Sequence, residues 1–288
     1  MAFMIPIYPD SVSLSLEMRG LLHPLFQQLP DGISEFTFAN IYLFREAHGY
    51  RVARFADGTI LLIGTDRGKA FFMLPFGLPE AEILRGLFYE FGVMKCVTDS
   101  QVEWLKELGC GISEDRDNFD YLYLRRDLAE LTGGKFHSKR NLIKAFLSNN
   151  SYEGKPLLEE YMPDALRILE EWRRGRDDPG DYLAAREGLE RAEELQLCGG
   201  IYYVDNRPVA YSLGEELMLG TSFAIHFEKA VADFKGLWQF VNQAFASILP
   251  EIYETVNREQ DLGDEGLRKA KLSYKPVGFV RKYKAYLS

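Results

Sequence analysis

Hydrophobic and polar positions in the first half of the chain alternate between the spacing of helices and the spacing of strands. Apolar residues recur at helical intervals over residues 34–47, with Ser34 as a candidate N-cap. Three short apolar runs follow, and turn residues such as Asp57-Gly58 separate them, which predicts an antiparallel meander. We expect its strands at 51–55, 59–64 and 70–74, then a helix after Pro79 that ends near Glu90, a strand at 93–97, a helix at 100–108 and a strand at 121–124.

The second half begins at a break, Gly133-Gly134, and repeats the alternation. An amphipathic helix follows the break, and residues 153–194 contain two helical patterns joined by a loop at 176–181. Three apolar runs with short turns between them then predict a second meander. The expected elements from there on are strands at 198–204, 208–214 and 221–227, a helix at 235–248, a strand at 252–256, a helix at 264–274 and a strand at 278–286.

Both halves share one order of elements: helix, hairpin strands, helix, strand, helix, strand. A chain of 288 residues has room for two domains at roughly 150 residues each. The order therefore predicts an α/β (α+β) protein of two related domains, residues 1–132 and 133–288, derived from a diverged internal repeat of about 140 residues.

Composition and charge limit the kinds of partner. The chain is 47% hydrophobic and 14% aromatic, which is typical of a globular protein and excludes a disordered one. A net charge of −9 argues against a protein whose whole surface binds nucleic acid or anionic membrane. Residues 266–288 nevertheless carry several Lys and Arg and no Asp or Glu. That segment is either a local site for an anionic partner or a solvated surface strand and helix.

The cysteines indicate a reducing compartment, and the amino terminus indicates a cytoplasmic location. The 3 cysteines are widely spaced, with no C-x-x-C pair and no histidine at zinc-ligand spacing, so we expect neither a disulfide framework nor a structural metal. The apolar amino terminus lacks a basic region and a cleavage site, and no run of 18 apolar residues occurs. We therefore expect a cytoplasmic protein with no transmembrane segment and at most peripheral membrane contact.

Familiar catalytic signatures such as G-x-S-x-G, a Walker loop or H-E-x-x-H do not occur in the sequence. Four other segments are informative: FHSKRNLIKAF, IHFEKA, NREQDLG and GLRKAKLSYKP. Through them the chain, from about Ser34 to Tyr286, resembles the phosphatidylglycerol lysyltransferase C-terminal domain family. The resemblance implies tandem GNAT-like acyltransferase domains, each a mixed, mostly antiparallel sheet flanked by helices and similar to Fem-type aminoacyltransferases, with the site in the second domain.

The resemblance specifies fold more narrowly than reaction, because stand-alone members of this size lack the membrane flippase half of lipid lysyltransferases. It implies an enzyme that moves an acyl or aminoacyl group from an activated donor, aminoacyl-tRNA or a coenzyme A thioester, to a small-molecule, lipid or peptide acceptor. The alternative is an inactive GNAT-like module that binds an anionic ligand, nucleic acid or a protein partner. The oligomeric state stays open.

Three residues are candidates for catalysis. His226 lies in an apolar strand, where it is either catalytic or a hydrogen-bonded core residue. Glu228 closes the same strand and is a candidate base for the acceptor amine, or else it forms an ion pair with Lys229 at the strand end. The resemblance implies that Tyr274 is a general acid for the leaving group.

Several polar residues are candidates for binding donor or substrate. Asn257, Arg258 and Asp261 lie in a loop between a strand and a helix, although Asp261 or Asp264 also suits a helix N-cap. Arg268 and Lys271 share one face of the last predicted helix with Tyr274. The resemblance implies that this basic pair holds a phosphate or carboxylate, whereas the alternative is a solvated face. A second candidate for phosphate contact, or else a plain surface helix, is formed by His137, Lys139, Arg140 and Asn141.

A candidate coenzyme A site lies at the start of the helix predicted at 235–248. GNAT enzymes hold the acyl-CoA pyrophosphate at such a helix start, where unpaired N–H groups and the helix dipole favour anions. The residues are Lys235, Gly236, Leu237, Trp238 and Gln239. The family's second glycine is replaced by Trp238, whose indole ring crowds a phosphate, whereas a Fem-type donor needs no such loop.

Overall fold

A computed structural model describes residues 4–174, 176–231 and 233–287. The chain forms two compact units. The first unit contains the chain up to Asp120, the short segment Gln260–Gly263 and the chain from Phe279 onward, and the second unit contains Tyr121–Glu259 and Asp264–Gly278. In the part of the chain that the structure describes, no helix is long and apolar enough to cross a membrane.

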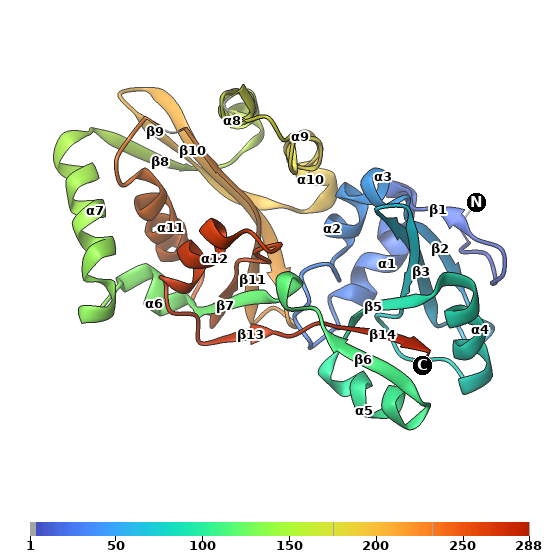
Figure 1. Ribbon diagram of the computed structural model, residues 1–288. Coiled ribbons are helices and arrows are strands. Elements are labelled where there is room, and N and C mark those ends of the chain that lie inside the picture. The colour runs from blue at the N-terminus through green and yellow to red at the C-terminus, as the bar shows by residue number, and fades with distance from the viewer. Residues whose placement is uncertain (1–3, 175, 232, 288) are drawn as a thin grey trace. The chain divides into compact units, whose positions relative to one another are not determined.

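The first unit is built on a seven-stranded sheet (Figure 1). Strands β2, β3 and β4 form the predicted antiparallel meander, and β4 then pairs in parallel with β5. The order across the sheet is β1 (Val12–Ser13), β2 (Arg51–Arg54), β3 (Ile60–Asp66), β4 (Lys69–Met73), β5 (Val93–Val97), β14 (Tyr283–Leu287) and β6 (Cys110–Glu114).

The helices of the first unit are α1 (Arg19–Phe26), α2 (Phe38–Leu43), α3 (Arg45–His48), α4 (Ala81–Phe91) and α5 (Asp99–Glu107). Leu84 and Leu87 of α4 and Leu105 of α5 are fully buried in one cluster with Phe72 and Met94 of the sheet. The predictions for α4 and α5 are confirmed to within a residue or two at each end. Strand β6 and helix α1 were not predicted.

The helix predicted from Ser34 begins later, and Ser34 is not its cap. The side chain of Thr37 caps α2 by accepting a hydrogen bond from the backbone N–H of Asn40 at 3.1 Å. Ser34 instead donates its backbone N–H and its hydroxyl to the two carboxylate oxygens of Asp120, at 2.9 and 3.0 Å. A distant carboxylate therefore holds the serine, and helical spacing alone does not reveal such a partner.

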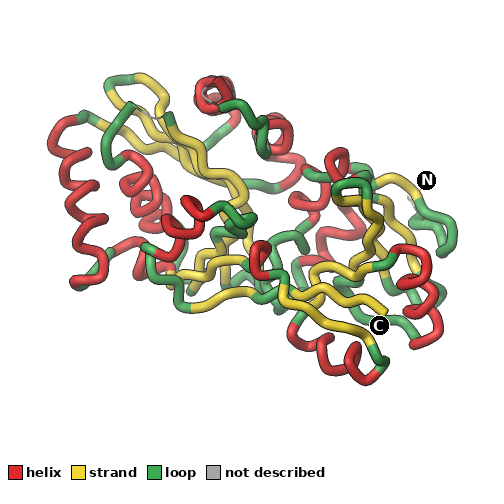
Figure 2. Tube along the Cα trace, viewed as in Figure 1, coloured by secondary structure: helices red, strands yellow, loops and turns green. Residues whose placement is uncertain are grey.

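The second unit repeats the topology of the first (Figure 2 shows the strands in yellow). Its sheet is also seven-stranded, with an antiparallel meander of β9, β10 and β11 followed by a parallel pair, β11 and β12. The order is β8 (Tyr152–Pro156), β9 (Cys198–Val204), β10 (Arg207–Leu217), β11 (Ser222–Ala230), β12 (Thr255–Asn257), β7 (Asp120–Leu124) and β13 (Gly278–Val280). The matching order of pairings supports the predicted internal repeat. Strand β8 was not predicted.

Helices cover both faces of this second sheet (Figure 1). They are α6 (Arg125–Glu130), α7 (His137–Asn149), α8 (Met162–Arg174), α9 (Tyr182–Glu190), α10 (Ala192–Leu195), α11 (Leu237–Ile248) and α12 (Glu265–Leu272). Helices α8 and α9 lie over one face, and α11 lies over the other with α6 and α7 beside it. Strand β10 is consequently buried along most of its length, as expected for a strand covered on both sides.

The structure divides the chain differently from the predicted boundary after residue 132. Strand β7 belongs to the second sheet, where it pairs with β12. The last strand of the chain, β14, completes the first sheet between β5 and β6. Amphipathic patterns are local and do not specify which strand pairs with which, so this path of the chain was not visible in the sequence.

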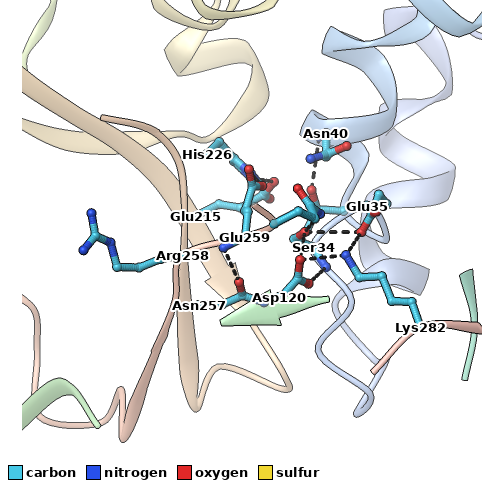
Figure 3. Close-up of polar contacts among 12 residues, drawn as sticks. Ser34, Glu35, Asn40, Asp120, Glu215, His226, Asn257, Arg258, Glu259 and Lys282 are labelled. Carbon is cyan, nitrogen blue, oxygen red and sulfur yellow. Dashed lines mark hydrogen bonds and ion pairs between the residues drawn. The ribbon is translucent and has the colours of Figure 1, made fainter. Parts of the chain in front are cut away.

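Lys282 anchors β14 to the first unit. Its side chain is 1% exposed, and its Nζ lies 2.6 Å from Asp120 Oδ1 and also bonds Glu35 (Figure 3). Burial by itself lowers the pKa of Lys282, but the charges of Asp120 and Glu35 outweigh burial and raise that pKa. Burial raises the pKa of Glu35, while the Lys282 ammonium opposes the rise.

We predict that Lys282→Met lowers the free energy of unfolding by about 3–5 kcal/mol, because it leaves the buried Asp120 carboxylate and the partly buried Glu35 carboxyl group without their cation. Lys284→Met is the matched control: its partner Asp115 lies 2.7 Å away, but Lys284 is 35% exposed. The control should cost under about 1 kcal/mol. Urea unfolding of both variants measures the difference, and equal losses would contradict the role of Lys282 as an anchor.

Candidate active site

The parallel pairing of β11 and β12 ends early and leaves room for polar side chains. The register runs from Ser222 opposite Thr255 to Ala224 opposite Asn257, where the pairing of the described residues ends. Strand β11 nevertheless continues to Ala230. In open sheets, ligands bind outside the carboxyl ends of parallel strands. The polar residues just beyond Ala224 and Asn257 are therefore the first place to look for a site.

His226 is the extra residue of a β-bulge at this point. In the pairing of β10 with β11, Leu213 lies opposite Phe227 and Gly214 opposite Ile225, so His226 has no partner of its own. Bulges of this kind bend a strand and redirect a side chain, and they are frequent beside active sites.

Two carboxylates hold the side chain of His226. Its Nδ1 lies 2.7 Å from Glu259 Oε1 and its Nε2 lies 3.0 Å from Glu215 Oε1 (Figure 3). Burial lowers the pKa of His226, but the hydrogen bonds and charges of the two glutamates outweigh it and raise the pKa to about 10. The ring is therefore an imidazolium at neutral pH, with both nitrogens donating. These contacts fit the alternative of a hydrogen-bonded core histidine better than that of a catalytic base.

Glu228 forms an ion pair with Arg258. Glu228 Oε1 lies 3.0 Å from Arg258 Nη2, and both side chains are largely buried, at 9% and 16% exposed. Asn242 of α11 lies beside both side chains. With its amide oxygen turned toward Arg258, Asn242 accepts from Nη1 at 2.5 Å and from Nη2 at 2.7 Å. The predicted loop and the predicted strand end thus meet here. In Figure 3 the Arg258 side chain points away from Glu259.

The ion pair expected between Glu228 and Lys229 does not form. Successive residues of a strand point to opposite faces of the sheet. Glu228 therefore lies on the side of α11, whereas Lys229 donates to both carboxylate oxygens of Asp181, at the start of α9, at 2.6 Å.

Tyr274 and Lys139 complete the cluster around Arg258. The Arg258 guanidinium lies 5.4 Å from the centre of the Tyr274 ring, and Lys139 Nζ lies 4.1 Å from it. Lys139 also donates to Ser273 Oγ at 2.6 Å. Burial raises the pKa of Tyr274 to about 12, with Arg258 opposing the rise and Glu228 adding to it. The phenol of Tyr274 therefore stays protonated at neutral pH. Burial, with the nearby Arg258 charge, lowers the pKa of Lys139.

Lys271 binds the protein backbone. Its ammonium is buried and donates to the carbonyl oxygens of Arg258 and Glu259, the latter at 3.1 Å. It therefore holds the loop that carries Arg258 in place. Arg268 lies half-buried on the same helix, α12, which ends at Leu272 rather than at the predicted residue 274.

The predicted loop residues divide between the two units. Asn257 is buried and accepts from the backbone N–H of Glu259 at 2.8 Å. Asp261 belongs to the first unit, where it accepts from Gly263 N–H at 2.9 Å and from Arg116 at 3.2 Å. Asp264, not Asp261, is the N-cap of α12, accepting from the backbone N–H of Leu267 at 2.7 Å.

The other basic residues predicted on α7 have local partners. Arg140 donates to the carbonyl oxygens of Leu131 and Gly133, the latter at 2.7 Å, so it caps the end of α6. His137 Nε2 and Asn141 Nδ2 lie 3.1 Å apart on the exposed side of the helix. Of the four residues predicted there, Lys139 is the one that contacts the cluster around Arg258.

Packing against α7 explains the glycine in the segment predicted to bind coenzyme A. Gly236 has φ of +88°, and a Cβ there would lie 2.2 Å from the carbonyl oxygen of Leu142 in α7. Leu237 is buried, Gln239 is half-buried, and Lys235 and Trp238 are exposed. Close contact with α7 is therefore sufficient to require glycine at the start of α11.

Sequence reasoning missed Asn242, Glu215 and Glu259 as members of these clusters. Asn242 had a detectable signal, because it is a buried amide among the apolar residues of α11. The two glutamates had none, since their partner His226 is 11 and 33 residues away in sequence. Within the described ranges, no group of three or more His, Cys, Asp or Glu residues is arranged to hold a metal ion.

Comparison with known proteins gives a family match. The model of a family described as "Phosphatidylglycerol lysyltransferase, C-terminal" matches residues 26–286. A conserved protein of unknown function from Bacteroides thetaiotaomicron VPI-5482 has a similar crystal structure, with a TM-score of 0.88 and 30% identity, over 99% of this chain and 100% of that one. An uncharacterised protein from Mycoplasmoides gallisepticum is 23% identical over 200 residues, 65% of this chain and 62% of that relative's length.

Several further solved structures are similar in fold. One is the C-terminal domain of a putative lysylphosphatidylglycerol synthetase from Agrobacterium fabrum (TM-score 0.67, 13% identity, 95% and 92% of the two chains). Another is L-PGS from Bacillus licheniformis (TM-score 0.66, 14% identity, 99% and 94% of the two chains).

The fold is also similar to that of FemX, with a TM-score of 0.58 and 10% identity over 97% of both chains. It is similar as well to a tandem GNAT protein from the clavulanic acid biosynthesis pathway, with a TM-score of 0.53 and 10% identity over 97% of this chain and 98% of that one. The predicted tandem GNAT-like fold is confirmed.

The two glutamates around His226 make stability depend on pH. The folded-state pKa of about 10 lies above the ordinary value of 6.5, so the contribution of His226 is complete below pH 6.5 and is lost as the pH rises through 10. We expect His226→Gln to be destabilised most at pH 6 and progressively less toward pH 10, relative to the unsubstituted protein. Urea unfolding at pH 6, 8 and 10 measures this, with the exposed His137→Gln as control. A difference that grows with pH would contradict it.

Proposed function

Because this chain belongs to the phosphatidylglycerol lysyltransferase C-terminal family, we propose that it is an aminoacyltransferase whose active site is the cluster of Glu228, Arg258, Tyr274 and Lys139. The observation that supports this site best is the buried Glu228–Arg258 pair at the end of the β11–β12 pairing. The donor in this proposal is an ester of an amino acid on tRNA. The acceptor is an amine or a hydroxyl, with phosphatidylglycerol as the first candidate because the family description names it.

Glu228 is the general base in this proposal. The acceptor N–H or O–H attacks the ester carbonyl carbon, a carboxylate oxygen of Glu228 takes the proton, and the new C–N or C–O bond forms. Arg258 holds the carboxylate in one orientation from the side, and the amide oxygen of Asn242 holds Arg258 in turn. A fixed base is effective because the proton transfer then needs no rearrangement of the side chain.

Lys139, Arg258 and Tyr274 act on the charge that develops on the donor. Attack places negative charge on the carbonyl oxygen, and cations held in a water-poor site stabilise that charge more strongly than they do in water. The ester C–O bond then breaks, and the Tyr274 hydroxyl donates its proton to the departing ribose oxygen. A raised pKa suits this role, because the hydroxyl is protonated at neutral pH.

The contact between α7 and α11 favours an aminoacyl ester over a coenzyme A thioester as donor. A carbonyl oxygen of α7, that of Leu142, faces Gly236 at the start of α11. In GNAT enzymes this helix start receives the pyrophosphate, and a carbonyl oxygen is a poor neighbour for an anion. Thermal-shift titration with acetyl-CoA tests this point: stabilisation by micromolar acetyl-CoA would reverse the choice of donor.

We predict that Glu228→Gln lowers kcat/KM for transfer from lysyl-tRNA to phosphatidylglycerol vesicles by about 10²–10⁴, because the amide cannot accept the proton. Lys269→Ala is the matched control, since Lys269 is 81% exposed on α12. The assay counts radioactive lysine in the lipid fraction. A second panel of soluble amines and peptides as acceptors extends the test. If the purified protein binds charged tRNA yet transfers to no acceptor, the chain is a binding module and the proposal fails.

We further predict that Tyr274→Phe lowers kcat by about 10²-fold while the KM for lysyl-tRNA changes little, because the hydroxyl acts only as the ester bond breaks. A lysyl donor with a better leaving group, such as the thioester of lysine with N-acetylcysteamine, needs no proton on the departing sulfur. This donor should therefore restore much of the rate of Tyr274→Phe. An equal loss with both donors would show that Tyr274 has no role as an acid.

A further inference from the structure

Two buried hydroxyls lie beside Glu228 on the face of the sheet that α11 covers. Ser212 is the direct partner of Glu228 in β11 and of Gly200 in β9, so the three residues form one row across the sheet. Tyr202 is two residues beyond Gly200 and therefore lies on the same face. Ser212 is fully buried and Tyr202 is 4% exposed, and neither hydroxyl has a hydrogen-bond partner in the part of the chain that the structure describes.

The Tyr202 hydroxyl points toward this row. It lies 3.3 Å from the position that a Cβ on Gly200 would occupy, so it sits above the glycine that pairs with Ser212. Burial raises the pKa of Tyr202, and the negative charge of Glu228 raises it further. The lack of a side chain at Gly200 is what allows the hydroxyl to reach this place.

The charge and hydrogen-bonding capacity of this group define the ligand that fits it. Glu228 Oε1 is paired with Arg258, whereas Oε2 receives no hydrogen bond from the described residues once Asn242 is turned to accept from Arg258. Leaving a buried hydroxyl unpaired is costly, so two of them on one face beside Glu228 indicate a missing partner. An anion is excluded by the Glu228 carboxylate, and an apolar group leaves both hydroxyls unpaired. A primary ammonium has three donors and one positive charge, which match two hydroxyl oxygens and one carboxylate oxygen.

We propose that Ser212, Tyr202 and Glu228 Oε2 form a subsite for a primary ammonium group of the aminoacyl donor. This inference rests on the proposed function and names the feature by which the site selects its substrate. An aminoacyl group with its ammonium in the subsite has its carbonyl carbon a short distance away, within the cluster of Arg258, Tyr274 and Lys139. The site then accepts aminoacyl esters and rejects acyl groups that carry no amine.

Direct binding of four amides tests the proposal without requiring transfer. Lysinamide has two ammonium groups, norleucinamide has only the α-ammonium, 6-aminohexanamide has only the side-chain ammonium, and hexanamide has none. We expect lysinamide to bind the full chain at least tenfold more tightly than hexanamide by calorimetric or NMR titration. Norleucinamide and 6-aminohexanamide identify which of the two ammonium groups is bound, because only one of them should keep most of the affinity of lysinamide.

Two variants remove one hydroxyl each. Ser212→Ala and Tyr202→Phe should each weaken lysinamide binding about tenfold and leave hexanamide unchanged, because hydrogen bonds to a charged group are stronger than neutral ones. Tyr211→Phe is the matched control. Tyr211 also has a buried hydroxyl for which the described residues provide no partner, but as the neighbour of Ser212 in β10 it points to the opposite face. The control should bind lysinamide as the unsubstituted protein does.

The outcomes separate this proposal from the proposed function. Equal binding of lysinamide and hexanamide, or unchanged lysinamide binding in both folded variants, would overturn the ammonium subsite and indicate that the hydroxyls hold a structural water. If lysinamide binds as predicted but no acceptor receives an aminoacyl group, the subsite stands and the aminoacyltransferase fails. Thermal unfolding of each variant confirms that it is folded before binding is measured, and Ser212→Cys is a second variant of nearly the same volume.

Discussion

The early end of the parallel pairing between β11 and β12 is the constraint on which the polar chemistry of the second unit depends. As long as two strands are paired, their backbone groups are satisfied and their side chains are packed under helices. Where β11 continues and β12 does not, side chains have to fill the space between the two chain segments. His226, Glu228, Arg258 and Glu259 all lie just beyond the last paired residues. The buried Lys271 ammonium then fixes the segment after β12 through two carbonyl oxygens.

Buried charge is used in two different ways by the Lys282 cluster of the first unit and the Glu228 cluster of the second. In the first unit Lys282, Asp120 and Ser34 satisfy one another, and such a complete network rigidifies the structure around it. In the second unit Arg258 is bonded to Glu228, but the hydroxyls of Ser212 and Tyr202 on the same face have no partner among the residues that the structure describes. A buried polar group without a partner is costly, so native structures keep few of them and their positions are informative. The proposed site therefore lies at the cluster around Glu228 and not at the cluster around Lys282.

The sequence segments that resemble the family contain much of the candidate site. IHFEKA contains His226 and Glu228, and NREQDLG contains Arg258, while Lys271 and Tyr274 come from GLRKAKLSYKP. Their individual contacts were not readable from those segments. Lys271, predicted to hold a phosphate, bonds the backbone, and Asp261 belongs to the other unit. A charged residue in a motif has the same letter whether it binds a ligand or a carbonyl oxygen, and only its three-dimensional surroundings distinguish the two.

The sequence by itself determined the two meanders, most of the helices, the family and the tandem GNAT-like fold, because these depend on hydrophobic spacing and on motifs that are local in the chain. Only the tertiary structure decided which strands share a sheet: β7 joins the second sheet, and the final strand β14 completes the first. It also decided which polar residues meet, since the partners of Glu228 and His226 lie on separate elements. Strand pairing and buried polar contacts join residues far apart in sequence, and neither produces a periodic pattern along the chain.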